Sequence, residues 1–248
     1  MLQYAGPQFL VLFAARVFAD FLLQQFRHTP EKDTIKQVLG AGFVHGLSAY
    51  LLLGDKSAIW AIPLFAVLHV CTRSICSNDS SDPRFYLLHW ILHSLLILYL
   101  AVLFQSLHVT CYWLVVWGTD FLYVLIILTG FILTVFTSGI YVELALLPFL
   151  PALRGTDSDQ GGLRNGGRLI GRLERALIFL FTLSGNLMAV GFLFTAKSVL
   201  RFGDLKQGSD RAEREYIIIG TLYSFFLALL IALATLSVIK TLPVYVAS

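Results

Sequence analysis

The chain has 248 residues, of which 57% are hydrophobic and only 13% are charged, and its formal net charge is +3. A soluble domain carries about 25% charged residues. Together with a mean hydropathy of +0.77, this composition excludes an ordinary soluble protein and indicates a multi-pass membrane protein. The basic residues gather at the ends of apolar runs, which favours contact with anionic membrane lipids and argues against nucleic acid as a partner.

The first half of the chain contains four apolar segments joined by short polar stretches. They are residues 7–26, 37–53, 57–76 and 85–107, of which the second is short. A membrane span needs roughly 20 predominantly apolar residues. Residues 1–110 are therefore predicted to form a four-helix membrane half.

Residues 111–153 form a longer apolar stretch in which only Asp120 and Glu143 are charged. This stretch is either one helix with an interfacial piece or a hairpin of two spans, and the sequence favours a break near Ser138 and Gly139. The polar, glycine-rich residues 154–167 then predict a flexible loop.

Two further spans are predicted in the second half, at residues 176–196 and 216–239, with a charged connector between them. Basic residues flank the first of these spans on both sides. Both flanks cannot lie in the cytoplasm if that span crosses fully, so the orientation of this half stays open. The prediction is an all-α, polytopic transmembrane bundle of about seven spans, within a range of six to eight. Its second half is residues 111–248, with basic juxtamembrane turns.

Polar residues four positions apart recur inside the first four segments. Residues at this spacing lie on one helix face, and polar groups at membrane depth turn towards the bundle interior. Each of segments one, three and four contains such a set, namely Arg16, Asp20 and Gln24, then His69 and Arg73, then His89 and His93.

His45 lies in the second segment between Gly42 and Gly46, whose GxxxG spacing permits close helix packing. We therefore expect one shared interior space that is faced by Asp20, His45, His69 and His93.

Two histidines at positions i and i+4 can bind one metal ion, because they project from the same side of a helix. A divalent metal such as zinc is the one cofactor that the pattern indicates, with candidate ligands Asp20, His45, His69, His89 and His93. The alternatives are a proton path and histidines that only form hydrogen bonds between helices. No catalytic residue is assigned. His28 and His108 lie at span ends and are predicted to be solvated.

Basic residues cluster at both ends of the span predicted at residues 176–196. Such residues set membrane topology and extend towards the headgroups, but arginine also binds lipid phosphate. Together with two arginines of the first half, they form the predicted lipid- or anion-binding set, which is Arg16, Arg73, Arg168, Arg172, Arg175, Lys197 and Arg201.

Motifs along most of the chain resemble a bacterial family catalogued as domain of unknown function 3307, which is similar in outline to membrane-bound metal-dependent hydrolases. In the first half the motifs are ARVFADFLLQQF, GFVHGLSAYLLL, AVLHVCTRSIC and FYLLHWILH. In the second half they are GRLIGRLER, GFLFTAKSVLRF and EYIIIGTLYSF. The resemblance implies a protein of the bacterial inner membrane, with Asp20, His45, His69 and His93 on polar positions of the family.

The chain departs from the family pattern at four of these positions. Arg16 and Ser48 stand where a histidine is usual, whereas Arg73 and His89 stand where an aspartate is usual. A guanidinium beside a divalent cation is unfavourable, and loss of an acidic ligand weakens the binding of hard metals. The site has either become a histidine-rich, zinc-like sphere or lost its metal.

Two functions follow from these observations. The preferred one is a non-catalytic or degenerate relative of the hydrolases, which acts through the membrane, a lipid, a protein partner or a second copy of the chain. The alternative is an active, membrane-embedded, metal-dependent hydrolase of a lipid-linked or small substrate. Whether the protein is an enzyme is left open.

Overall fold

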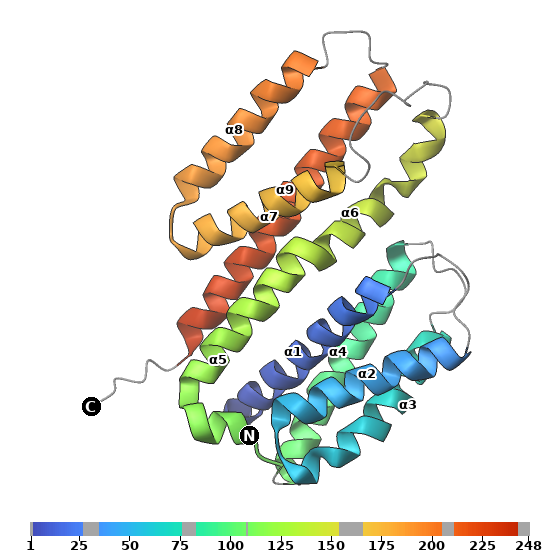
Figure 1. The fold of residues 1–248 in the computed structure, drawn as a ribbon, viewed down its shortest axis with the longest axis vertical. Helices are drawn as coiled ribbons and strands as arrows, with labels where there is room; N and C mark the ends of the chain where they lie inside the picture. The colour runs from blue at the N-terminus through green and yellow to red at the C-terminus, as the bar shows by residue number, and fades with distance from the viewer. Residues whose placement is uncertain are drawn as a thin grey trace. The chain divides into compact units, whose positions relative to one another are not determined.

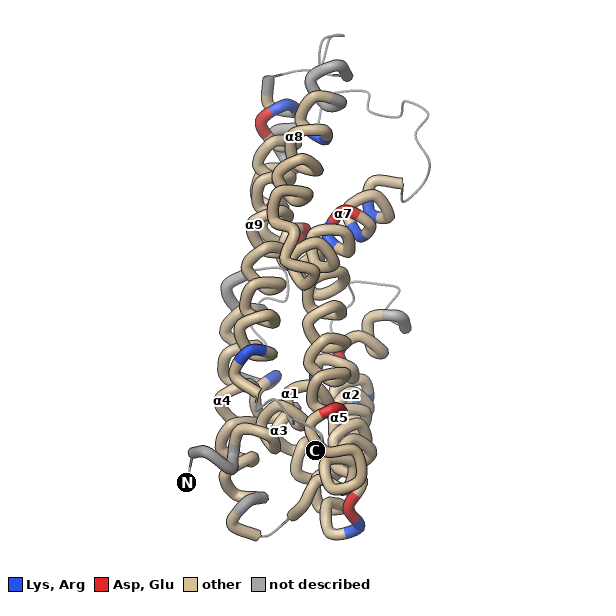
Figure 2. Tube along the Cα trace, turned by 90° about the vertical axis from the view of Figure 1, so that its left-hand side faces the viewer, with Lys and Arg blue, Asp and Glu red and all other residues tan. Residues whose placement is uncertain are grey.

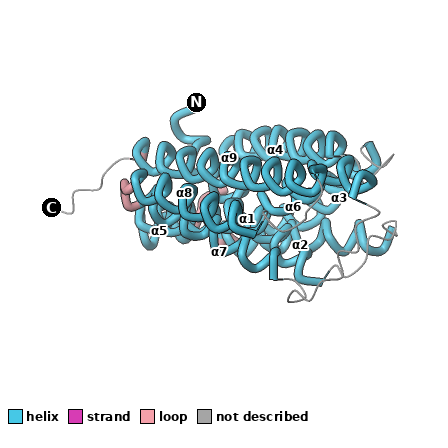
Figure 3. The backbone as a smooth tube through the Cα atoms, turned by 90° about the horizontal axis from the view of Figure 1, so that it is seen from above, coloured by secondary structure: helices cyan, strands magenta, loops and turns pink. Residues whose placement is uncertain are grey.

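The computed structural model describes residues 2–26, 35–75, 83–107, 109–153, 166–204 and 211–242. All regular secondary structure in these ranges is helical (Figure 3). Five helical stretches among the described residues are long and apolar enough to cross a membrane. The protein is therefore a helical membrane protein, as predicted, while the count of about seven spans is not confirmed. The five are Gly6–Gln24, Lys56–Ser74, Leu87–Phe104, Tyr112–Leu150 and Arg214–Thr241.

The chain divides into two compact units. The first comprises Met1–Thr129 and Thr241–Ser248, and the second comprises Gly130–Lys240. The sequence analysis placed the division at residue 110, whereas the contacts place it inside the long helix α5 (Tyr112–Ile132).

Four helices of the first unit form a closed ring. Contacts join α1 to α2, α2 to α3, α3 to α4 and α4 back to α1 (Figure 1). Side chains that face the centre of the ring can therefore come from all four helices. The elements are α1 (Leu2–Phe26), α2 (Ile35–Leu53), the short 3₁₀ helix η1 (Lys56–Trp60), α3 (Ala61–Ile75) and α4 (Pro83–Ser106).

Glycines of α2 allow α3 to approach closely. A Cβ atom at Gly46 would lie 2.6 Å from the Cα atom of Ile62, and one at Gly42 would lie 2.8 Å from the Cα atom of Ala66. Real Cβ atoms do not approach other atoms so closely, so both positions require glycine. The helix contact predicted from the GxxxG spacing is confirmed.

Asp55 connects the turn between α2 and η1 with the turn that precedes α5, at one end of the ring. Its Oδ1 atom accepts a hydrogen bond from the Ser57 backbone N–H at 2.9 Å. Its Oδ2 atom accepts from the backbone N–H of Thr110 at 3.3 Å and from the Thr110 hydroxyl at 3.2 Å. The exposed Trp60 lies on η1 and the exposed Trp117 lies on α5, the two helices that start at these turns. Tryptophan is enriched where a membrane meets water, so we expect this end of the unit to lie at such an interface.

Substitution of Asp55 by alanine is expected to lower the free energy of unfolding by about 1 kcal/mol at pH 7, because it removes the cap of η1. The backbone hydrogen bond from Ser57, followed by the bonds from Thr110, holds the pKa of Asp55 below its ordinary value. A carboxyl group with a lowered pKa stabilises the fold above its ordinary pKa and loses this effect as the pH falls through the folded value.

The difference between the Asp55→Ala variant and the wild type should therefore narrow below about pH 4. Thermal unfolding of the detergent-purified protein at several pH values measures this difference in stability. Lys56→Ala is the control at the neighbouring exposed position. A difference that stays constant from pH 7 to pH 3 would contradict the role of the Asp55 carboxylate.

Residues 112–153, all of which are described, form one continuous helical run. After α5 come a π-helical segment η2 (Leu133–Thr137), α6 (Ser138–Leu146) and the 3₁₀ helix η3 (Leu147–Leu153). The interpretation of this stretch as a hairpin of two spans is therefore wrong. The break predicted near Ser138 is a change of helical geometry, which ends at Thr137. A separate kink lies at Gly118, where φ is +59°.

The predicted span at residues 176–196 is also wrong, because the chain folds back in its middle. Helix α7 (Gly166–Leu183) ends at a tight turn, and α8 (Leu187–Asp204) starts directly after it (Figure 1). Gly185 adopts a φ of +75°, which glycine reaches without strain. Asn186 then caps α8 by accepting a hydrogen bond from the Ala189 backbone N–H at 3.2 Å. Hydropathy alone does not detect this turn, because the residues on both sides are apolar.

The hairpin of α7 and α8 brings the basic flanks of the apolar run to the same end. Lys197 of α8 forms an ion pair with Glu174 of α7. At 1.5 Å per residue, the apolar arms 176–183 and 187–196 are about 12 and 15 Å long, which is half the thickness of a hydrocarbon core. The conflict with the positive-inside rule disappears, because a segment that folds back in its middle has both basic flanks at one end.

The core of the second unit joins the hairpin to the last helix, α9 (Arg211–Thr241). Ile178 of α7 and Val190 of α8 pack against Phe225 and Ala228 of α9. Basic and acidic residues lie together on α7 (Figure 2).

Candidate functional site

Three buried histidines converge inside the ring of the first unit. His69 comes from α3, and His89 and His93 come from α4. One nitrogen atom of each ring lies within 4.8 Å of the corresponding atoms of the other two. His93 is more central than His89, as predicted, because it is fully buried and its ring contacts those of His45, His69 and His89. The ring of His69 likewise contacts the other three histidine rings.

Several nitrogen atoms of this three-histidine group have no hydrogen-bond partner. Both ring nitrogens of His93 and the Nδ1 atom of His69 are buried without one. A buried polar atom that lacks a partner costs about 1–3 kcal/mol. Ligation of a metal ion would use one ring lone pair of each histidine, so the geometry fits a metal. Helix packing alone would leave these buried nitrogens without a partner.

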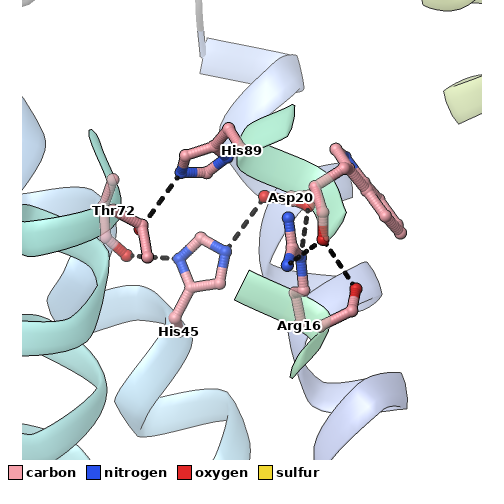
Figure 4. Close-up of polar contacts among 8 residues, drawn as sticks. Arg16, Asp20, His45, Thr72 and His89 are labelled. Atoms are coloured by element: carbon pink, nitrogen blue, oxygen red, sulfur yellow. Dashed lines mark hydrogen bonds and ion pairs between the residues drawn. The ribbon is translucent and has the colours of Figure 1, made fainter. Parts of the chain in front are cut away.

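Thr72 of α3 orients His89. The Thr72 hydroxyl donates its one proton to backbone carbonyl oxygens of its own helix, that of Leu68 at 2.9 Å and that of His69 at 3.1 Å. It therefore accepts from the Nε2–H group of His89, at 3.4 Å (Figure 4). The lone pair of His89 is then on Nδ1. Such an outer partner fixes the orientation of a metal ligand. The sequence analysis missed Thr72, although its spacing of three from His69 places it on the same helix face.

Asp20 of α1 joins His45 of α2 to Arg16. His45 Nε2 lies 2.9 Å from Asp20 Oδ1, and His45 Nδ1 lies 2.7 Å from the Ala41 carbonyl oxygen. His45 therefore links the backbone of its own helix to the Asp20 carboxylate. Arg16 Nε lies 3.5 Å from Asp20 Oδ2 (Figure 4).

Arg16 is also fixed by α4, because its Nη1 atom donates to the Trp90 carbonyl oxygen at 3.3 Å. Its guanidinium stacks over the Trp90 ring at 4.3 Å. The bulk of its side chain is buried, and its charge lies against Asp20. Arg16 therefore forms an ion pair inside the bundle.

The four residues predicted to share one interior space lie together. The Asp20–His45 pair continues into the three-histidine group, since the rings of His45 and His69 stack at 4.7 Å. Asp20 and His45 bind each other and lie outside the group whose nitrogens converge. Their role as metal ligands stays a prediction.

A cavity of about 410 Å³ opens beside the site. Its lining includes two of the histidines, His69 and His89, and Asp20 is the one carboxylate among the described residues that line it. Arg16, Gln24 and Arg73 also line it, so the polar faces predicted for α1 and α3 border the same space. A molecule in this cavity would contact both the histidines and two guanidinium groups.

The other predicted site residues belong to the second unit or lie outside the described residues. Arg168, Arg175 and Lys197 border one cavity, while Arg172 stacks over the Phe136 ring. The side chain of Arg201, His28, His108 and residues 154–165 of the loop predicted at 154–167 lie outside the described part of the chain. The last two residues of that predicted loop are helical instead, because α7 starts at Gly166.

Comparisons with protein-family models, with curated proteins and with solved structures found no match to this chain. The resemblance to the bacterial family stays an expectation from the sequence motifs. The site is therefore interpreted from its own residues and distances.

Proposed function

We propose that the first unit binds one divalent transition-metal ion, such as zinc, through His69, His89 and His93, and that the protein is a membrane-embedded metal-dependent hydrolase. The observation that carries the proposal is the convergence of three buried imidazoles whose nitrogens include three without a partner. Imidazole is a preferred ligand of zinc, and three protein ligands leave a fourth position open. Zinc at this position would supply Lewis-acid activation of water.

The neighbouring residues have separate tasks in this proposal. Thr72 orients His89, and the Asp20–His45 pair holds a carboxylate at the cavity. Arg16 and Arg73 line the same cavity and favour an anionic group on the substrate. The proposed substrate class is therefore an anionic lipid-linked or small molecule. The resemblance of the sequence motifs supports the bacterial inner membrane as the proposed location of the reaction.

A second candidate is the non-catalytic or degenerate protein that the sequence analysis preferred. It is supported by the contacts of Asp20, because both oxygens of this carboxylate are engaged, one with His45 and the other with Arg16. A carboxylate held in this way is a poor general base. In this case the polar cluster would serve assembly with lipid, a protein partner or a second copy of the chain.

Metal analysis of the purified protein tests the site. After loading with zinc, the wild type is expected to hold about one ion per chain, and His93→Ala is expected to lose at least about tenfold in affinity. Cys71→Ser is the matched control, because Cys71 is an exposed potential ligand two residues from His69. Equal loss in both variants, or no bound metal in the wild type, would refute the site.

Activity separates the two candidates. The zinc-loaded wild type is expected to hydrolyse phosphate or carboxylate esters in detergent, and His93→Ala to lose this activity. Hydrolysis that survives in His93→Ala would contradict the first candidate, while bound zinc without hydrolysis would favour the second.

A further inference from the structure

A second cavity, of about 470 Å³, lies inside the second unit between α6, α7, α8 and α9. Its lining combines apolar side chains, such as Leu146 and Ile217, with several charged side chains. The ionisable side chains on it, apart from Tyr216, are Glu143, Arg168, Glu174, Arg175 and Lys197. A ligand there would contact both an apolar wall and several charges.

Arg175 is the buried cation of this cavity, with only 6% of its surface exposed. Its Nε and Nη2 atoms donate to the Val135 carbonyl oxygen at 3.2 and 2.8 Å, and its Nη1 atom donates to Ser224 Oγ at 3.3 Å. Val135 lies in the π-helical segment η2, a type of irregularity that is frequent at functional sites. Among the described residues no carboxylate pairs with Arg175, so the bonds fix its guanidinium without neutralising it.

Two glycines make room for this guanidinium. A Cβ atom at Gly139 of α6 would lie 2.6 Å from Nη2 of Arg175, and one at Gly171 of α7 would lie 3.2 Å from Nη1. Any side chain at Gly139 would displace the arginine. The helix backbones are therefore shaped around Arg175, as expected for a built site.

The remaining charges of the cavity cancel in pairs. Lys197 pairs with Glu174, and Arg168 pairs with Glu143 at 3.1 Å. The excess is one positive charge, that of Arg175. A phosphodiester carries one negative charge, and arginine offers it two parallel N–H groups. Three of the five N–H groups of Arg175 are used by Val135 and Ser224, which leaves two for such a ligand.

We propose that this cavity binds the phosphodiester group of a membrane phospholipid, with Arg175 as its anion-binding residue. The apolar wall of Leu146 and Ile217 would contact the acyl chains next to the phosphodiester. The inference does not depend on the metal site, because every residue that it uses lies in the second unit.

Lipid binding to the full-length, delipidated protein in detergent tests the proposal. The probes are phosphatidylglycerol, diacylglycerol without a phosphate, and glycerophosphoglycerol as a soluble phosphodiester. Arg175→Gln is expected to weaken phosphatidylglycerol binding at least about tenfold. Arg172 belongs to the lipid- or anion-binding set predicted from sequence, but it is exposed and does not line this cavity. Arg172→Gln removes the same charge from the same helix and is therefore expected to bind like the wild type.

Ser224→Ala provides a second test in case the Arg175→Gln variant does not fold. It keeps the charge and removes one bond that positions the guanidinium, so a loss of about threefold is expected. Weak binding of diacylglycerol to the wild type identifies the phosphodiester as the recognised group. Binding of glycerophosphoglycerol as tight as that of the lipid would overturn the lipid source and indicate a soluble ligand. Phosphatidylglycerol binding that is equal in Ser224→Ala, Arg172→Gln and the wild type would overturn the site.

Discussion

The Asp20→Asn variant is expected to lose about 3–5 kcal/mol of unfolding free energy, the cost of leaving a buried charge without its partner. Asp20 is the carboxylate against which both the buried Arg16 and His45 lie. Asparagine keeps the volume of the side chain but not its charge. The guanidinium would then remain inside the bundle without this counter-charge, while the asparagine amide can still form a hydrogen bond with His45. Thermal or denaturant unfolding in detergent measures the loss.

A double substitution supplies the control for this prediction. In Arg16→Met/Asp20→Asn both charges are removed together, so no buried charge of this pair is left without its partner. The double variant is therefore expected to be more stable than Asp20→Asn alone, by at least about 1 kcal/mol. A loss below about 1 kcal/mol in Asp20→Asn would show that water reaches this ion pair and screens it.

The Gly46→Ala variant is expected to lose about 1–3 kcal/mol of unfolding free energy, the range for an overpacked core. The new methyl group would meet the backbone of α3 at Ile62, and a backbone cannot rotate away as a side chain can. Since His45 and His69 face each other across the same contact, we also expect the variant to bind zinc more weakly.

Gly40→Ala is the matched control on the same helix. A Cβ atom at Gly40 would meet nothing within 4 Å, and alanine favours helix by about 1 kcal/mol over glycine. This variant should be as stable as the wild type or more stable. If Gly46→Ala and Gly40→Ala unfold alike, the close contact between α2 and α3 does not exist as described.

Much of the first unit is predictable from sequence because its signals are local. The spacing of four places Arg16, Asp20 and Gln24 on one helix face, and all three line the cavity beside the histidines. The GxxxG pattern around His45 predicts a close helix contact, which depends only on the absence of side chains. The second unit was harder to predict, because the turn around Gly185 takes only three residues, Ser184, Gly185 and Asn186, of a long apolar run and hardly lowers its average hydropathy.

The sequence by itself determined that the protein is helical and membrane-embedded and that its first four apolar segments turn polar faces inward. These properties follow from composition and helical periodicity, which are signals within single segments. They are reliable in a membrane protein, because the backbone N–H and C=O groups must form their hydrogen bonds within the chain when no water is present. The tertiary structure decided which polar groups pair. It placed Asp20 against His45 and Arg16, brought His69 to His89 and His93, and buried Arg175 against Val135. These pairings depend on how helices distant in sequence pack, and no spacing within one helix encodes that geometry.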